Sequence, residues 1–456
     1  MYTRLLMLFM LPGLVAGTAS SADWTRFRGP NGSGIGTGDA LPPQTRSDSE
    51  NVKWKTALPG PGLSSPIVVG DRVVVTCWSG YAVDPASPGS PDDLKRNVVC
   101  LDRATGDIQW QHVQDPVLPE DTYRGMFAQN GYASHTPVTD GARVYAFFGK
   151  TGVVALDLTS GQKLWQKSVG ENLEGKGWGS ASSPILYRDT VIVPAFIEGD
   201  SLVAINGETG AVVWEQKTPG YRGNWSTPIL VEANDRTDLV LAVPGEVWGL
   251  NPESGKLRWY CEVPGSDSAR ASVIAHGDVV IAMAGGRGAN TSIAVPAGGK
   301  GDVQPLWTGR DVSGIGTPVI HDGTMYLVSD KVATSVNLED GRRIAQTRLT
   351  GAAAGGQPAR GAGDRGAQQG GRGRGGYGGG PGGGRDYSSP VVAGNHLFYA
   401  SRSGDVFVVE LGEKMTQIAR NSFESDRTDF SATPAIADGQ LFIRSSKSIY
   451  CIAAEK

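Results

Sequence analysis

Cysteine and histidine are scarce in this chain of 456 residues, which contains four cysteines and five histidines. No two cysteines are adjacent and none form a Cys-x-x-Cys pair, so the thiol-redox and haem-attachment motifs are missing. No pair of histidines has the spacing of zinc ligands, and no Gly-x-Ser-x-Gly motif marks a hydrolase nucleophile. The common short motifs of catalysis therefore give no function.

Long apolar runs are missing after the first 22 residues, and neither sign of charge dominates. The formal net charge is −4, which gives no support for binding to nucleic acid or anionic membranes. The one apolar run, residues 5–17, follows Arg4 and ends near small residues, as in a secretory signal peptide. The run is shorter than the roughly 20 residues of a membrane anchor, and no cysteine follows it for lipidation. We therefore expect residues 1–22 to be cleaved and the protein to be periplasmic or secreted.

What the sequence does have is a repeated hairpin. Residues 153–158 alternate as in a strand, Thr159, Ser160 and Gly161 supply a turn, and a second strand carries Trp165. The Asp or Asn before each turn can bond backbone N–H groups, and the tryptophan offers a large apolar surface to a neighbour. The repeat tryptophans are Trp54, Trp110, Trp165, Trp214, Trp259 and Trp307.

A second repeated unit, a hydroxyl residue before proline followed by two short apolar strands, precedes the hairpins. Most copies lie about 45 residues apart, the length of one propeller blade. The copies begin at Ser65, Thr136, Ser183, Thr227, Ser272, Thr317, Ser389 and Thr433, of which only Ser272 lacks the proline. Eight copies predict an all-β fold, an eight-bladed β-propeller of four-stranded antiparallel blades.

The last blade lacks its outermost strand, because the chain ends soon after residues 449–452. Near the other terminus, residues 51–56 form a strand-like stretch around Trp54 that has no partners of its own. We predict that this stretch completes the eighth blade and so removes two exposed sheet edges. Residues 23–50 then form an N-terminal segment outside the blades, and residues 51–456 form the propeller.

Three long insertions interrupt the repeats, at residues 78–97, 115–134 and 351–386. In a four-stranded meander all three emerge on one face of the ring, which we call the decorated face. Loops held by a rigid scaffold often bind ligands, although insertions are also tolerated wherever loops reach solvent. The insert 351–386 is almost entirely Gly, Ala, Arg and Gln, so we expect it to be disordered.

The cysteines leave one question open. Cys77 ends one strand of the first blade and Cys100 lies in the next, so both a disulfide and two free thiols are compatible with the pattern. Cys261 and Cys451 fall in distant blades, where we expect buried thiols.

Residues just before each Ser/Thr-Pro unit should surround the mouth of the propeller axis. Aromatic rings with an Arg and a His would suit a planar or anionic ligand, while the alternative is that they only plug the channel. Asp429 is the acid nominated as a catalytic base. The candidate ligand-binding residues are Tyr132, His135, Trp178, Asn224, Trp225, Arg270, Tyr387 and Phe430.

The repeat Asp/Asn-x-x-Thr/Ser-Gly-x-x-x-Trp resembles that of the pyrroloquinoline-quinone (PQQ) repeat family. The start of the N-terminal segment, Trp24-x-x-Phe27-Arg28-Gly29, is also similar to that family. The resemblance covers residues 24–456 apart from the glycine-rich insert. It implies either a quinoprotein dehydrogenase with PQQ and Ca²⁺ on the axis, or a protein-binding propeller such as the outer-membrane β-barrel assembly lipoprotein.

Of these two functions we expect the second. The adjacent cysteine pair of the dehydrogenases is missing, and no calcium ligand set could be placed. The sequence therefore predicts an exported, monomeric, non-catalytic binding or scaffold protein whose partner is an envelope protein or a small molecule. The alternative is a PQQ- and Ca²⁺-dependent oxidoreductase acting on an alcohol or a sugar, with Asp429 as the base.

Overall fold

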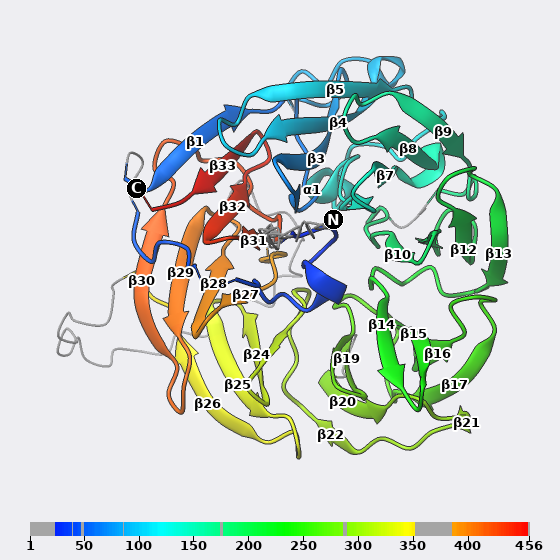
Figure 1. Ribbon diagram of the computed structural model, residues 1–456, viewed down its shortest axis with the longest axis vertical. Helices are drawn as coiled ribbons and strands as arrows, with labels where there is room; N and C mark the ends of the chain where they lie inside the picture. Colours follow the sequence, from blue (N-terminus) through cyan, green and yellow to red (C-terminus); the bar gives the residue numbers. More distant parts are fainter. Residues whose placement is uncertain are drawn as a thin grey trace, which may run out of the picture.

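The protein is a ring of eight antiparallel sheets around a central axis, as Figure 1 shows for the computed structural model. The predicted eight-bladed propeller is confirmed. The structure describes residues 23–38, 40–46, 50–84, 86–173, 177–285, 290–351 and 385–454. The predicted signal peptide and nearly all of the glycine-rich insert lie outside these residues.

The first four blades each begin at the axis and end at the rim. Blade one comprises β2 (Ile67–Val69), β3 (Arg72–Ser79), β4 (Lys95–Asp102) and β5 (Ile108–Gln114). Blade two comprises β6 (Val138–Thr139), β7 (Arg143–Phe147), β8 (Val153–Asp157) and β9 (Lys163–Lys167). Blade three comprises β10 (Ile185–Tyr187), β11 (Thr190–Ala195), β12 (Ser201–Asn206) and β13 (Val212–Lys217). Blade four comprises β14 (Ile229–Ala233), β15 (Arg236–Val243), β16 (Glu246–Leu250) and β17 (Leu257–Glu262), with β21 (Gly301–Asp302) added at its edge.

The other four blades continue the ring. Blade five comprises β18 (Ile274–His276), β19 (Val279–Gly285), β20 (Asn290–Pro296) and β22 (Trp307–Gly309). Blade six comprises β23 (Val319–His321), β24 (Thr324–Ser329), β25 (Val332–Asn337) and β26 (Arg343–Arg348). Blade seven comprises β27 (Val391–Ala393), β28 (His396–Ala400), β29 (Asp405–Glu410) and β30 (Thr416–Ser422). Blade eight comprises β31 (Ala435–Ala437), β32 (Gln440–Arg444), β33 (Ser448–Ile452) and β1 (Val52–Ala57). The short helices are η1 (Pro30–Gly32), η2 (Pro91–Asp93), α1 (Phe127–Asn130) and η3 (Gly149–Thr151).

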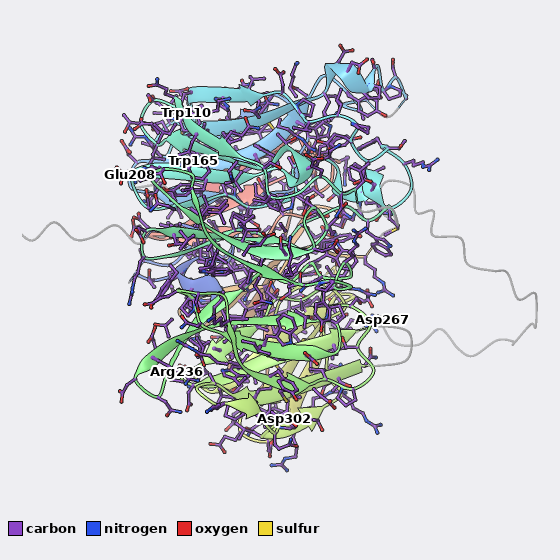
Figure 2. The ribbon with its side chains drawn as sticks, turned by 90° about the vertical axis from the view of Figure 1, so that its right-hand side faces the viewer. Trp110, Trp165, Glu208, Arg236, Asp267 and Asp302 are labelled. Atoms are coloured by element: carbon purple, nitrogen blue, oxygen red, sulfur yellow. The ribbon has the colours of Figure 1, made fainter. Side chains whose placement is uncertain are left out.

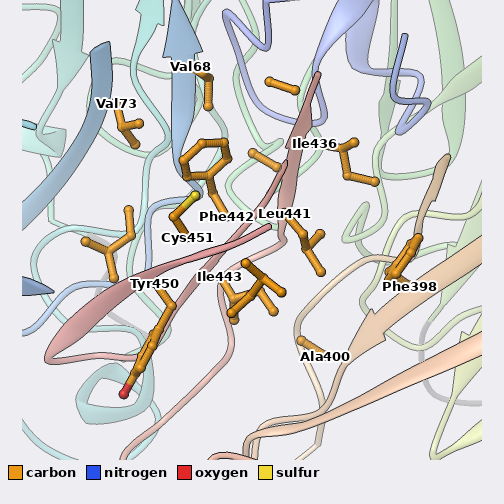
Figure 3. Packing of buried hydrophobic residues seen from close by; sticks show 14 of the residues in the cluster. Val68, Val73, Phe398, Ala400, Ile436, Leu441, Phe442, Ile443, Tyr450 and Cys451 are labelled. Atoms are coloured by element: carbon orange, nitrogen blue, oxygen red, sulfur yellow. The ribbon is translucent and has the colours of Figure 1, made fainter. Parts of the chain in front are cut away.

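The two ends of the chain close the ring in blade eight. Strand β1 pairs antiparallel with β33, and Trp54 lies opposite Cys451, as the sequence predicted. The apolar layer around this junction joins blade eight to both of its neighbours: Figure 3 shows Phe442 and Cys451 near Val73 of blade one, and Phe398 of blade seven beside the same layer. Burial of this layer makes the two chain ends part of one core.

Each repeat tryptophan but one docks on the turn of the following blade. The indole N–H groups of Trp54, Trp110, Trp165, Trp214 and Trp307 donate to carbonyl oxygens of those turns over 2.8–3.0 Å. The turn glycine packs closely against the indole ring. A Cβ added to Gly161 would come within 2.6 Å of Trp110. The Thr/Ser-Gly and Trp of the repeat are therefore two halves of one contact between adjacent blades.

Blade five differs from this pattern of tryptophan-to-turn contacts. It has no Asp-x-x-Thr-Gly turn for Trp259, whose indole N–H instead donates to the buried carboxylate of Asp238 over 2.6 Å. The same carboxylate is paired with Arg258 and Arg236. Strand β21 then pairs in parallel with the rim strand β17. Trp259 is thus a repeat tryptophan with a different partner.

A closed circle of hydrogen bonds surrounds the axis. The backbone N–H of each hydroxyl residue that opens a blade donates to the hydroxyl of the equivalent residue in the next blade, over 2.9–3.1 Å. Ser272 takes part although it lacks the following proline. We call these residues the hydroxyl ring: Ser65, Thr136, Ser183, Thr227, Ser272, Thr317, Ser389 and Thr433.

The N-terminal segment crosses the centre of the ring, where Figure 1 shows it in blue. Its Trp24 pairs with Val68 of blade one. Arg28 is fully buried and donates to the carbonyl oxygens of Thr317 and Pro390 over 2.9 and 3.1 Å. Since these carbonyls come from blades six and seven, the segment ties distant blades together across the axis.

The four cysteines are buried free thiols. Cys77 lies opposite Asn97 and Cys100 opposite Val74, so the two side chains point to opposite faces of the blade-one sheet and belong to different apolar layers. A disulfide would need both on one face. Burial raises the pKa of Cys77 to about 11 and that of Cys100 to about 12, which leaves both thiols protonated and unreactive at neutral pH.

Within the described residues, no helix has the length and hydropathy needed to cross a bilayer.

Replacing Trp54 by alanine should destabilise the protein more than any rim substitution outside the tryptophan contacts. The indole is 8% exposed, and truncating a buried tryptophan typically costs about 3–5 kcal/mol. The control is Ile344→Ala, because Ile344 occupies the rim of blade six and is 50% exposed. Thermal unfolding should show a large fall in melting temperature for Trp54→Ala only. Equal falls would contradict the closure of the ring through β1.

Replacing Thr227 by valine should remove one bond of the hydroxyl ring while preserving shape. The amide of Ser183 then loses its acceptor in a buried position, at a cost of about 1–3 kcal/mol. Hydrogen exchange should show faster exchange of the Ser183 amide, with little change for Thr227→Ser. Unchanged protection in the valine variant would show that this bond is not formed.

Candidate functional site

A cavity of about 500 Å³ lies at the axis, and the hydroxyl ring forms part of its wall. We call it the axial cup. It opens on the decorated face: Figure 2 shows Asp267, a cup residue, on the side of the molecule opposite Glu208, which lies in a turn between β12 and β13. The cup is also lined by Phe27, Leu63, Asn130, Trp178, Trp225, Arg270, Ile315 and Tyr387.

Aromatic side chains give the cup a flat apolar wall. The rings of Trp178 and Trp225 lie 6.1 Å apart at 53°. The Trp225 indole N–H donates to the carbonyl of Gly179 over 2.7 Å, and the Asn130 amide donates to the carbonyl of Trp178 over 2.8 Å. The first bond holds the Trp225 ring and the second holds the backbone of Trp178, and both residues line the cup.

Tyr387 completes the aromatic wall from the opposite side of the ring of blades, just before the hydroxyl residue of blade seven. The Arg402 guanidinium lies 5.6 Å from the centre of its ring. Burial raises the pKa of the Tyr387 phenol above its ordinary value. The phenol is therefore a neutral hydrogen-bond donor at neutral pH.

Among the described residues, the charged ones that line the cup are one base, Arg270, and one acid, Asp267, both in the connection between blades four and five. Beneath them the hydroxyl ring supplies polar groups, and Phe27 of the N-terminal segment supplies an apolar patch. The cup therefore combines stacking surfaces, many hydroxyl groups and a single ion of each sign at its mouth.

Four of the predicted ligand-binding residues line the cup and four do not. Trp178, Trp225, Arg270 and Tyr387 line it. The others are buried beside it: Tyr132 packs on Trp78, His135 contacts Ser180, Asn224 donates to a carbonyl of blade four, and Phe430 stacks on Phe423. Ligand binding by any of the eight residues stays a prediction.

Tyr132 and His135 lie elsewhere because the connection 115–134 folds onto the loop between β3 and β4. Tyr132 is 3% exposed and its hydroxyl donates to the carbonyl of Asp121 over 2.7 Å. Burial lowers the pKa of His135 to about 3, so its imidazole is neutral. Their positions depend on tertiary packing that the spacing of the repeats does not reveal.

Asp429, the acid nominated as a base, lies outside the cup. Its carboxylate forms an ion pair with Arg402 over 2.6 Å and accepts the N–H of Ser431 over 2.8 Å. It borders a separate cavity of about 200 Å³ with Lys447 and Tyr123. The Asp429 carboxylate is therefore already engaged by a cation and a backbone N–H.

A small polar cavity of about 30 Å³ lies behind the cup, and Ser134 borders both. Glu198 is buried there with one carboxylate oxygen that has no hydrogen-bond partner. Burial raises the pKa of Glu198 to about 7. The Ser180 hydroxyl bonds this carboxyl and lies 2.9 Å from Nε2 of His135. The cavity is large enough for ordered water.

The described residues offer no group of three or more His, Cys, Asp or Glu side chains that could hold a metal ion. Ca²⁺ takes six to eight oxygen ligands, several of them usually carboxylates, whereas Asp267 is the one acid among the described residues that line the cup. These residues do not fit a calcium-bound quinone centre.

Comparison with known proteins identifies the family. The family model described as outer membrane protein assembly factor BamB matches residues 45–178 and 95–352. The chain belongs to this PQQ-like β-propeller family. Its repeats and eight-bladed fold are those that the sequence motif predicted.

Curated relatives of the PQQ-like chain include redox enzymes. A polyvinylalcohol dehydrogenase of a Pseudomonas species is 25% identical over 48% of this chain and 37% of its own. The quinoprotein alcohol dehydrogenase PedH of Pseudomonas putida is 27% identical over 29% of this chain and 23% of its own. The match thus spans little more than a third of these relatives at most, so their activities do not transfer to this chain.

Solved structures share the fold. BamB from Moraxella catarrhalis is 13% identical, with a TM-score of 0.58 over 89% of this chain and 97% of that one. A europium-containing methanol dehydrogenase is 10% identical, with a TM-score of 0.64 over 95% and 98% of the two chains. At these identities the likeness shows the propeller architecture and does not separate a binding protein from an enzyme.

Replacing Glu198 by glutamine should make the protein's stability less dependent on pH. The folded-state pKa of Glu198, about 7, exceeds its ordinary value of 4.5. The contribution of this group to the stability of the folded protein is therefore fully present below pH 4.5. It is lost as the pH rises towards 7. That loss has an upper limit of about 1.4 kcal/mol per pH unit. The melting temperature of Glu198→Gln, relative to the native protein, should therefore be higher at pH 8 than at pH 5.

The control for this comparison is Glu171→Gln, since Glu171 is exposed in the connection after β9. Its difference from the native protein should stay constant with pH. If Glu198→Gln behaves in the same way, Glu198 is ionised in the folded protein at pH 5 and its burial has been misassigned.

Proposed function

We propose that this PQQ-like propeller is a non-catalytic binding protein that takes its ligand or partner at the decorated face. The observation that carries the proposal is the axial cup, a cavity of about 500 Å³ with aromatic walls that opens on that face. Cavities of this size and composition are typical of ligand sites on rigid scaffolds. The connection 115–134 contributes Asn130 and Ser134 to the wall of the cup, and loops held by a rigid scaffold often bind a partner.

The acidic and thiol side chains favour a binding protein over an oxidoreductase. Asp429 is already paired with Arg402, and the cup has one acid where a calcium–quinone centre would need several oxygen ligands. The four cysteines are buried free thiols, and no two are adjacent in the sequence. Each of these features differs from what the resemblance to quinoprotein dehydrogenases implied.

We also propose that the protein works in the cell envelope. The apolar run at residues 5–17 has the form of a secretory leader, and the matched family is described as an outer membrane assembly factor. The partner would then be an envelope protein or a small molecule that reaches the periplasm. A monomer suffices, because the cup is built from one chain.

The second candidate, a PQQ-dependent oxidoreductase, is favoured by the redox relatives and can be tested directly. The purified protein is mixed with PQQ and CaCl₂, and its melting temperature and the reduction of an artificial electron acceptor by alcohols and sugars are measured. The proposal predicts no turnover, and no additional stabilisation when CaCl₂ is added to PQQ. Calcium-dependent turnover that is lost in Asp429→Asn would overturn it.

A further inference from the structure

We infer that the cavity of about 200 Å³ beside the axial cup is a second binding site, which takes a small zwitterion with an apolar body, either an aromatic amino acid or a dipeptide. We call this cavity the side pocket. The inference goes beyond the proposed function, because it concerns a site outside the axial cup and does not depend on what the cup binds. The side pocket is bordered by Trp78, Asp84, Tyr123, Gln129, Asp429 and Lys447.

Loops of the decorated face from different blades build the side pocket. Asp84 lies in the loop between β3 and β4 of blade one, and Lys447 lies in the loop between β32 and β33 of blade eight. The connection 115–134 adds Tyr123 and Gln129. Binding residues are often placed in this way, on loops that a rigid scaffold holds in position.

Aromatic rings form one wall of the side pocket. The rings of Trp78 and Tyr123 lie 6.1 Å apart at 54°, and Tyr123 stacks on Tyr132 with 6.0 Å between the ring centres. The Trp78 indole N–H donates to the carbonyl of Tyr81 over 3.1 Å. Burial of the phenol and the nearby charge of Asp429 raise the pKa of Tyr123, so the phenol is a neutral hydrogen-bond donor at neutral pH. The wall therefore offers a ligand both apolar surface and a donor.

The charge of Asp429 is already balanced inside the protein. Its carboxylate pairs with Arg402 over 2.6 Å, and Arg402 also donates to the amide oxygen of Gln129 over 2.9 Å. The same guanidinium lies 5.6 Å from the centre of the Tyr387 ring, which lines the axial cup. Arg402 thus contacts residues of both cavities, and Asp429 has no unbalanced charge for a ligand.

One charge of each sign is left unbalanced at the border of the side pocket. Asp84 and Lys447 are exposed, and neither forms an ion pair within the described residues. The Asp84 carboxylate accepts the N–H of Ala86 over 2.9 Å, which leaves its negative charge intact. Because both groups border one pocket, a ligand with an ammonium and a carboxylate can meet both at once. Such charge-assisted hydrogen bonds are stronger than those between neutral groups.

The volume of the side pocket limits the size of the ligand. Sites for drug-sized molecules measure about 300–1,000 Å³, so a cavity of about 200 Å³ suits an amino acid or a dipeptide. Leu63 and Val83 add apolar surface to that of Trp78 and Tyr123. An aromatic side chain of the ligand can pack on this surface while its charged groups stay at the exposed border.

The test uses four probes that differ in charge or length. Glycyl-phenylalanine carries both charges, its acetylated form lacks the ammonium, and its amide lacks the carboxylate. Free phenylalanine carries both charges on a shorter body and so distinguishes an amino acid from a peptide as the ligand. Binding to the full-length protein is measured by calorimetry at pH 7 and low salt. We expect each capped form to bind about tenfold more weakly than the uncapped dipeptide, because each loses a hydrogen bond to a charged group.

Two variants locate the charges. Asp84→Asn should weaken the uncapped dipeptide about tenfold and leave the acetylated form unchanged, because that form has no ammonium. Lys447→Gln should weaken the uncapped dipeptide to a similar extent and leave the amide unchanged. The matched controls are Asp92→Asn, in the same loop as Asp84, and Lys256→Gln, before β17, since both residues are exposed and lie outside the side pocket. Neither control should change any affinity.

This crossed pattern of probes and variants supports the inference, and the tighter of glycyl-phenylalanine and phenylalanine identifies the ligand. Absence of binding at millimolar concentrations would overturn it, as would affinities that Asp84→Asn and Lys447→Gln leave unchanged. Those results would leave the proposed binding function at the axial cup intact. Turnover with PQQ and CaCl₂ would instead contradict the proposed function and not the side pocket, so the two failures are distinguishable.

Discussion

The circle of hydrogen bonds around the axis is the constraint on which the rest of the structure depends. Each blade contributes one N–H and one hydroxyl to the hydroxyl ring, so each is held by both neighbours at the point where its first strand begins. At the rim the indole of one blade docks on the turn of the next. This rim contact is present at five of the eight junctions, whereas the hydrogen bond at the axis is present at all eight.

The same arrangement explains why a cavity remains at the centre. The hydroxyl ring keeps the first strands apart, and the N-terminal segment fills the space beyond it with Arg26, Phe27 and Arg28. The cup is therefore a consequence of how the ring is closed, and its polar lining is made of groups that first serve assembly.

Much of the fold could be predicted from the sequence because its signals are local. The turn at Gly161 and the strand around Trp54 follow from period and turn chemistry. In the sequence, the hydroxyl ring appears only as a Ser or Thr that recurs in each repeat. Its hydrogen bonds between blades become evident only once the blades are arranged around the axis. The burial of Tyr132 and the partner of Trp259 depend on contacts between distant segments, which no local pattern specifies.

The most direct test of the central claim is a crystal structure of the protein soaked with 4-bromobenzoate, with the bromine located by its anomalous signal. The account predicts one bromine site in the axial cup, with the benzene ring against Trp178 or Trp225. A bromine site on the outer rim, with the cup filled only by water, would contradict it.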